Sequence, residues 1–375
     1  ARGDKVETFT GTLLSSSAQG LILKARDGSV HSLPYNQGIR LPQLPGGLIT
    51  KPTLLWDLVS GKAGMHRSRV SYQTGGVTWW ADYNVTYAEG ADAQACTLDV
   101  GAWVSILNQS GAGYPDATVK LVAGDVHRAP TKGRYPESRA YDRMAAMSAE
   151  APGFQEKSFF EYHLYTLGRP TTLPDNSTKQ IELFPTAHGV PCRKMLVYAG
   201  MPQAYWGYVQ SPMVERHLGV ETNKKVEVYL KFKNSETHRM GMPLPAGRIR
   251  VSKLDPSDRS LEFIGEDQLD HTPKDEPVLI KMGSAFDVVG ERKQVDFKVD
   301  TSNRTMIETI DVTLRNHKAE PVTVLVREQL YRWGNWKITA KTQDYEKQDA
   351  RTIHFPVKLA KDGEATVRYT VLYTW

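Results

Sequence analysis

The chain has 375 residues, of which 40% are hydrophobic and 24% are charged, and its formal net charge is +5. This composition is typical of a globular protein and excludes intrinsic disorder, and no run of about 18 apolar residues is present that would form a transmembrane helix. Basic and acidic residues are interleaved, so we expect a solvated surface and no nucleic-acid partner.

The N-terminal region predicts a small β unit. Apolar and β-branched residues alternate over residues 6–33, and Asp27-Gly28 is a hairpin signal between the runs ILKA and SVHSL. The next segment, LPQLPGGLITKPTLLW, has three prolines and a glycine pair, which a regular helix would not tolerate. We therefore predict a small N-terminal β unit and connector over residues 1–50.

Strand patterns resume after residue 67 and predict a first β-sandwich region over residues 51–213. The expected strands include SRVSYQT, VTWWADYNVTY, CTLDVGAWVSILNQS and ATVKLVAGDV. In the second of these, alternate residues from Val77 to Tyr87 are apolar and would share one face. A linker rich in Pro, Ala and mixed charges is predicted to interrupt the region at about 127–157, with one helical turn at MAAMSAE.

A second series of alternating segments starts at KVEVYLKFKNS and ends at Trp375. The segments recur roughly every 10–15 residues with turn residues between them, and no helix of crossover length intervenes, which favours antiparallel sheets. The predicted fold class is all-β, with tandem antiparallel β-sandwich domains. The C-terminal domain, residues 214–375, is expected to be immunoglobulin-like.

The two cysteines, Cys96 and Cys192, each border a strand-like run. Neither has a CxxC neighbour or a histidine at zinc-ligand spacing, which argues against a metal site. We expect a disulfide between them; the alternative is two buried free thiols. The first residue, Ala1, fits the removal of a secretory signal, so a periplasmic or extracellular location is expected.

No catalytic motif is present: the sequence lacks a P-loop, a GxSxG elbow, an HExxH helix and an EF-hand loop. The histidines are scattered, and His163, His188 and His271 lack ligand spacing. Glu262 and Glu266 resemble an acid/base pair only in their separation, and surface carboxylates are common. We therefore predict no catalytic residue, no cofactor-binding residue and no metal ligand.

Aromatic residues gather in two short stretches, Trp79-Trp80 and the group Tyr205, Trp206 and Tyr208. Such rings either pack in a core or form an exposed platform for sugars or a protein partner. Because neighbouring strand residues point to opposite faces, Trp79 and Trp80 cannot both face the same core. These five residues are the candidate ligand or partner platform.

Several segments together carry a family resemblance, from about residue 50 to the C-terminus. They are VSYQTGGVTWWADYNVTY, LNQSGAGYPDATVKLVAGDVHR, FEYHLYTLGRPTTLPDNSTKQIELF, FKNSETHRMGMPLPAGRIRV, FIGEDQLDHTPKDEPVLIKMGSAFDV, LRNHKAEPVTVLVREQL and YTVLYTW. With them the chain resembles the bacterial family known as domain of unknown function 4139, which includes the mucoidy-inhibitor-like proteins. The resemblance implies an exported, envelope-associated, mostly β protein of unassigned activity, and it supplies no catalytic residues.

Three functions follow as hypotheses. The first is a non-enzymatic envelope or extracellular protein that acts through protein–protein contacts, including self-assembly into a surface layer or filament, because many strands have edges that can pair with neighbours. The second is a carbohydrate-binding module that uses the aromatic platforms. The third is a hydrolase whose site is assembled only in the fold.

Overall fold

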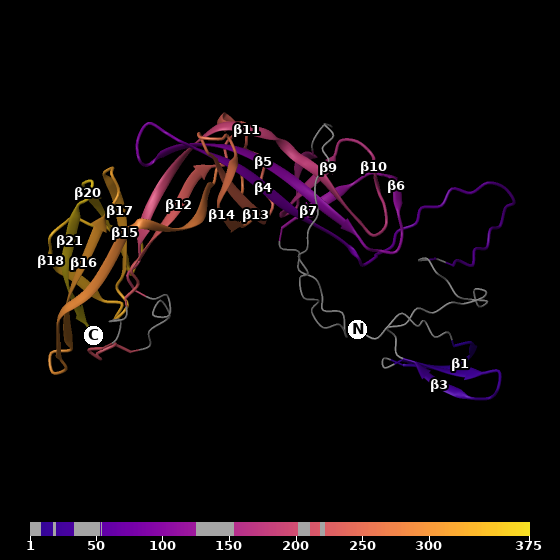
Figure 1. Cartoon of the computed structure of the whole chain (residues 1–375), viewed down its shortest axis with the longest axis horizontal. Coiled ribbons are helices and arrows are strands. Elements are labelled where there is room, and N and C mark those ends of the chain that lie inside the picture. The colour runs from indigo at the N-terminus through magenta and orange to yellow at the C-terminus, as the bar shows by residue number, and fades with distance from the viewer. Residues whose placement is uncertain are drawn as a thin grey trace. The chain divides into compact units, whose positions relative to one another are not determined.

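The computed structural model describes residues 9–17, 20–33, 53, 55–124, 154–201, 211–217 and 222–375. The chain divides into two compact units, Ala1–His66 and Arg67–Trp375. The described residues form strands and one 3-10 helix, η2 (Glu236–His238), which confirms the all-β prediction (Figure 1). Within these segments, no helix has the length and apolar character needed to cross a membrane.

The first unit contains a three-stranded antiparallel sheet in the order β1-β2-β3. Its strands are β1 (Gly11–Ser17), β2 (Gly20–Ala25) and β3 (Val30–Leu33). The predicted Asp27-Gly28 hairpin is confirmed: the Ser29 N–H donates to Asp27 Oδ1 at 2.9 Å, and Gly28 adopts φ 89°. Only glycine takes up this backbone angle readily, which is why the chain turns there.

The second unit contains the remaining strands. They are β4 (Val77–Glu89), β5 (Ala95–Asn108), β6 (Tyr114–Ala117), β7 (Lys120–Ala123), β8 (Phe154–Phe159), β9 (Tyr162–Leu167), β10 (Thr171–Leu173), β11 (Ser177–Tyr198), β12 (Lys225–Lys233), β13 (Gly247–Leu254), β14 (Leu261–Leu269), β15 (Pro277–Asp300), β16 (Thr305–Asn316), β17 (Val322–Gln329), β18 (Trp336–Lys341), β19 (Glu346–Lys347), β20 (Thr352–Leu359) and β21 (Glu364–Thr374). Their main path runs β14-β13-β4-β5-β11-β12-β15-β16-β21-β18, and β17, β20 and β19 join it through β11.

The predicted face of β4 is confirmed. Ala81, Tyr83, Val85 and Tyr87 are buried, and Trp79 packs against the same core. The expected strand at SRVSYQT is wrong, because residues 68–74 form no strand. Of the predicted linker, residues 154–157 belong to β8; the rest of the linker, including the MAAMSAE turn, lies outside the described residues.

Two hydrophobic cores lie within the second unit. In the first, side chains from β4 and β5 pack with others from the small sheets β7-β9-β8 and β10-β6, such as Val85, Leu98, Leu121 and Tyr165. β13 and β14, which follow residue 213 in the chain, also belong to this core. Residues 225–282 therefore contribute largely to the first core and not to the C-terminal one.

The second core is an antiparallel sandwich. Ile310 of β16 and Val371 of β21 pack with Val326 of β17 and Phe355 of β20. Figure 1 shows β16, β17, β20 and β21 grouped together, toward the yellow end of the colour scale. Alternation along these strands places apolar residues inside and polar residues outside.

Two long strands run through both cores. β11 contributes Leu183 to the first core and Tyr198 to the second, and β15 contributes Ile280 to the first and Phe297 to the second. Register shifts interrupt β11 between Glu182 and Val190, where bulges bend the strand. The two cores are therefore built on shared strands.

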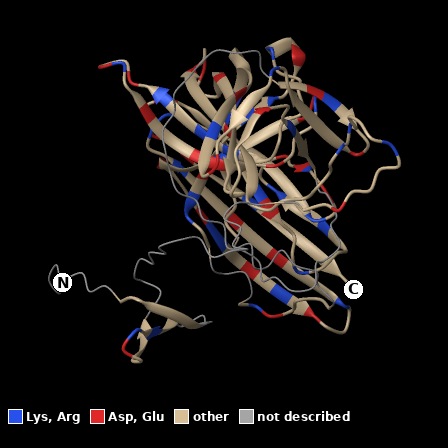
Figure 2. Ribbon diagram, turned by 90° about the vertical axis from the view of Figure 1, so that its right-hand side faces the viewer, with Lys and Arg blue, Asp and Glu red and all other residues tan. Residues whose placement is uncertain are grey.

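Among the strands that the structure describes, two pairings are parallel, β4 with β13 and β11 with β17. In each case a long stretch of chain separates the partners, as parallel pairing requires. Charged residues of both signs are mixed along the ribbon, as Figure 2 shows, in agreement with the interleaving seen in the sequence.

Candidate partner-binding site

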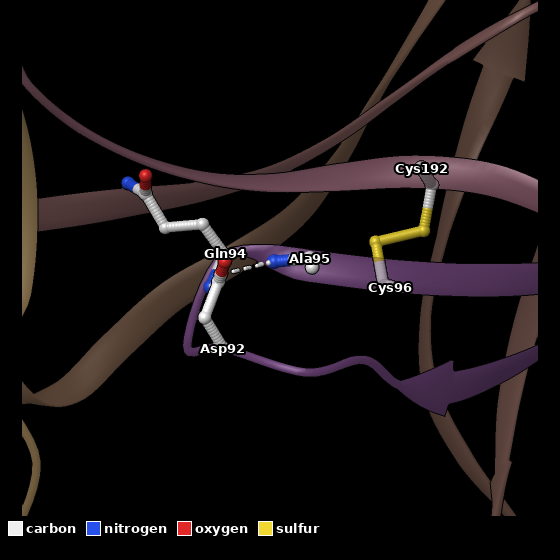
Figure 3. The surroundings of a disulfide bond; sticks show 5 residues. All are labelled: Asp92, Gln94, Ala95, Cys96 and Cys192. Atoms are coloured by element: carbon white, nitrogen blue, oxygen red, sulfur yellow. Dashed lines mark hydrogen bonds between the residues drawn. A yellow bond between two sulfur atoms is a disulfide. The ribbon is translucent and has the colours of Figure 1, made fainter.

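A disulfide joins two strands close to Gln94 and Lys194, which line a pocket described below. Cys96 of β5 and Cys192 of β11 lie opposite each other in the strand register, with their Cα atoms 4.9 Å apart. They form the predicted disulfide, which Figure 3 shows joining the two strands. The bond links residues 96 positions apart in the chain. It fixes β5 against β11 beside the turn that precedes β5.

Asp92 shapes that turn. Its Oδ1 accepts hydrogen bonds from the backbone N–H groups of Gln94 at 2.8 Å and Ala95 at 2.7 Å (Figure 3). These bonds, that from Ala95 first, lower the pKa of Asp92, so the carboxylate stays charged and holds the turn at neutral pH. The Gln94 side chain reaches across to β17, where its Nε2 donates to Thr323 O at 3.4 Å.

Gln94 lines a pocket of about 150 Å³ beside the second core. Its apolar wall comes from Leu196 of β11, Val228 of β12, Ala285 of β15 and Val322 of β17. The four residues come from four strands that are far apart in the sequence. Periodicity places each one on its strand, but no sequence signal indicates that they meet, so the sequence alone does not predict this pocket.

Two lysines, Lys194 and Lys318, and one glutamate, Glu320, line the pocket. Among the described residues neither lysine forms an ion pair. Nearby, Glu89 is paired with Lys253, with 2.6 Å between Oε1 and Nζ, and this hydrogen bond is the main cause that lowers the pKa of Glu89. Lys194 and Lys318 contribute smaller effects in the same direction. The pocket therefore combines an apolar wall with two lysines and one glutamate, so that positive charge exceeds negative charge at its rim.

Trp79 and Trp80 of the predicted aromatic platform lie in different surroundings. Trp79 packs against the first core, whereas the Trp80 Nε1–H donates to Asp82 Oδ2 at 2.7 Å. The two rings are half-buried and on opposite faces of β4, as the strand geometry requires, so they do not form one flat surface. Tyr205, Trp206 and Tyr208 lie outside the described residues.

The scattered histidines have separate local partners. His163 lies 2.7 Å from Glu156, His188 lies 3.0 Å from Asp99, and His271 Nδ1 accepts from the Ala246 N–H. In the part of the chain that the structure describes, no three His, Cys, Asp or Glu side chains gather as metal ligands do.

The two glutamates considered as an acid/base pair have partners of their own. Glu262 accepts from the Ser260 hydroxyl at 2.8 Å, and Glu266 pairs with Arg250 at 3.4 Å. Both carboxylates lie on the exposed strand β14. An enclosed site that raises the pKa of a carboxyl group favours general acid catalysis, and both of these carboxylates are exposed.

A cluster of four charged side chains lies inside the second core. Arg292 pairs with Glu328 at 2.9 Å and Arg332 with Glu308 at 3.0 Å, and all four side chains are 0–2% exposed. The Tyr369 hydroxyl donates to Glu328. Burial opposes the charge of Arg292, but Glu328 offsets it and the pKa of Arg292 rises. A substrate would not reach groups buried this deeply, so we assign the cluster a structural role.

Arg332 extends the cluster to the segment 211–217. Its Nη1 donates to the carbonyl oxygens of Met213 and Glu215, each at 2.8 Å, and the Met213 N–H donates back to the Arg332 carbonyl at 3.0 Å. The guanidinium also stacks on the ring of Phe297, with 4.2 Å to the centroid. A single buried arginine thus fastens this segment to the second core.

Comparison with known proteins gives one result on the family. A family model described as "Domain of unknown function (DUF4139)" matches residues 68–375, which is nearly all of the second unit. No curated protein matches the chain.

Proposed function

The chain belongs to the family described as Domain of unknown function (DUF4139), and from this premise we propose that it is a non-enzymatic, exported cell-envelope or extracellular protein that associates with copies of itself. The family carries no assigned activity, so the proposal depends on the surface of the molecule. Protein–protein contact is the function that this surface supports best.

The edge strand β14 carries the proposal. Among the described residues its only strand partner is β13. β15 lies against part of β14, where the Lys281 N–H donates to Asp267 Oδ2 at 2.6 Å and Gly265 lies against Met282. Leu261 and Phe263 lie outside these contacts, so we take the start of β14 as the free part of the edge. Leu261 and Phe263 on this strand are 60% and 61% exposed. Exposed apolar side chains on an unpaired edge favour the addition of a further strand from a partner.

The opposite end of the sheet has a different character. The terminal strand β18 carries Lys337 and Lys341, and lysine on an edge strand discourages pairing with an identical edge. β14 contains three acidic residues and no basic ones: Glu262, Glu266 and Asp267. The charges of the two edges are complementary, which favours a second copy of the chain as the partner of β14.

The disulfide supports an exported location. Disulfides persist in the periplasm and outside the cell and are rare in the reducing cytosol. The Cys96–Cys192 bond therefore fits a protein that folds after export.

Self-association is tested by sedimentation velocity over a wide range of concentration, together with electron microscopy of natively purified protein. We expect oligomers or polymers for the natural sequence. Phe263→Lys should weaken association by more than about tenfold, since it places a charge in the apolar contact. The control Leu279→Lys changes a residue that is 54% exposed on β15, which already pairs with β12 at that point, and it should have no effect. A natural protein that stays monomeric at high concentration would contradict the proposal.

A further inference from the structure

We propose that the β8–β9 hairpin of one copy inserts Phe160 into the pocket beside the disulfide of another copy. This inference rests on the proposed self-association and adds a second contact to the one at β14. The observations that carry it are an exposed, strained aromatic tip and a pocket that fits a phenyl ring.

The tip of the hairpin is aromatic and exposed. Phe159 pairs with Tyr162, so Phe160 and Glu161 form a two-residue loop. Phe159 is 58% exposed and Phe160 is 82% exposed. The hairpin is anchored below by Tyr165, which is buried and donates its hydroxyl hydrogen to Pro243 O at 2.7 Å. The tip therefore projects an apolar pair from a fixed base.

Phe160 has an unfavourable backbone conformation. Its φ is 59°, in the left-handed region, where two-residue hairpin loops normally place Gly, Asn or Asp. A bulky residue in this region is an outlier, and such strain persists mainly at functional positions. Within its own chain the largely exposed ring of Phe160 meets the ring of Tyr162, with 6.0 Å between the centroids. A contact between this ring and a partner explains why phenylalanine occupies the position.

The pocket fits such a ring. An apolar cavity of about 150 Å³ accommodates one benzene molecule in another protein, and the pocket bounded by Leu196, Val228, Ala285 and Val322 has a volume of about 150 Å³. Because Phe160 is 82% exposed, it does not fill the pocket of its own chain. The ring that enters must come from elsewhere.

Charges favour the same pairing. Glu161 follows Phe160 at the tip and forms no ion pair within the described segments. At the pocket, the ammonium groups of Lys194 and Lys318 are also without an ion pair there. Insertion of Phe160 would bring a carboxylate close to these lysines. Desolvated pairs at a protein interface orient the partners and exclude wrong ones.

The contact is heterologous, because the tip and the pocket are different surfaces of the same molecule. A heterologous contact links copies head to tail, and it yields a ring when the rotation closes and a filament when it does not. The expected assemblies are therefore larger than dimers.

Two variants test the hairpin tip and the pocket independently. Phe160→Asn removes the ring and keeps a residue that tolerates the left-handed region. Ala285→Phe fills the pocket with a ring from within. Each variant alone should self-associate more than about tenfold more weakly than the natural protein in sedimentation velocity. Mixed with each other, the intact tip of one meets the intact pocket of the other, so the mixed affinity should return to near the natural value.

A charge exchange gives a second measurement if Ala285→Phe does not fold. Glu161→Lys and Lys318→Glu should each weaken association, and the two together in one chain should restore it. Leu279→Asn serves as the control and should leave association unchanged. If the natural protein assembles and the tip and pocket variants assemble equally well, this inference is wrong while the proposed function stands. A natural protein that never assembles overturns both.

Discussion

Arg292 and Glu328 form an ion pair in the second core with both side chains almost fully buried, at 2% and 1% exposure. A pair enclosed in this way leaves an uncompensated charge when one partner is removed. Glu328→Ala should therefore lower the free energy of unfolding by about 3–5 kcal/mol, measured by urea denaturation. As a control, Glu89→Ala breaks the exposed pair with Lys253 and should change it by at most about 1 kcal/mol. Equal effects of the two changes would contradict the structural role of the buried cluster.

The disulfide should contribute strongly to stability, because it closes a long loop in the unfolded chain. For a separation of 96 residues, the chain-entropy relation gives about 4–5 kcal/mol. Cys96→Ser with Cys192→Ser should therefore lower the urea midpoint markedly. Reductant should lower the midpoint of the natural protein and leave that of the double variant unchanged. An unchanged midpoint of the natural protein under reductant would refute this expectation.

Phe160→Asn should stabilise the fold while it weakens assembly. The left-handed backbone at Phe160 costs a bulky residue about 1 kcal/mol more than it costs asparagine, so the variant should gain about 0.5–1 kcal/mol. The measurement is urea denaturation at a concentration where the protein is monomeric. Phe159→Asn is the matched change on the neighbouring strand residue and should bring no gain. A loss of stability in Phe160→Asn would show that the ring packs in its own fold.

His354 should make stability fall as the pH drops below about 6.5. Burial, followed by the charge of Arg327, lowers the pKa of His354 in the folded state. The unfolded chain then binds more protons than the folded one below the ordinary pKa, so stability is lost as the pH falls through the folded pKa. His354→Gln should reduce the difference in urea midpoint between pH 8 and pH 5 that the natural protein shows. A pH dependence that is the same in the natural protein and the variant would exclude His354 as a cause.

Alternation along single strands was the most informative signal in the sequence. It placed Tyr83 and Val85 on the buried face of β4, and it favoured the all-β fold. The same periodicity holds for Glu328, which shares the face of Val324 and Val326 on β17. A charged residue in register with a buried face is the signal that could have revealed the buried cluster.

Breaks in alternation were harder to interpret. The sequence suggests three separate segments, VLIKM, AFDVVGE and KQVDFKVD, but all lie in the single strand β15. Gly283 follows the first of these segments, and Gly290 lies within the second. Gly290 lies against the ring of Tyr198, where an added Cβ would come within 2.2 Å of a ring atom. Close packing, and not a turn, explains this glycine.

The pocket and the hairpin tip could not be predicted from the residue pattern of any single strand, for two reasons. Val228 and Ala285 meet only because β12 and β15 pair. The periodicity of a strand does not indicate which other strand it pairs with. The turn at Phe160 lacks the Asn-Gly or Asp-Gly step that marks a short hairpin. The sequence Phe159-Phe160-Glu161 between two strand-like runs was the signal that could have indicated a hairpin tip here.

Because β11 and β15 pass through both cores, the second unit cannot be divided between the cores without breaking these strands. A cut between the cores would sever each strand in mid-sheet and leave its amides and carbonyls without their ladder partners. Neither half would be a module that can be excised, swapped into another protein or expressed alone. The unit Arg67–Trp375 keeps both ladders whole.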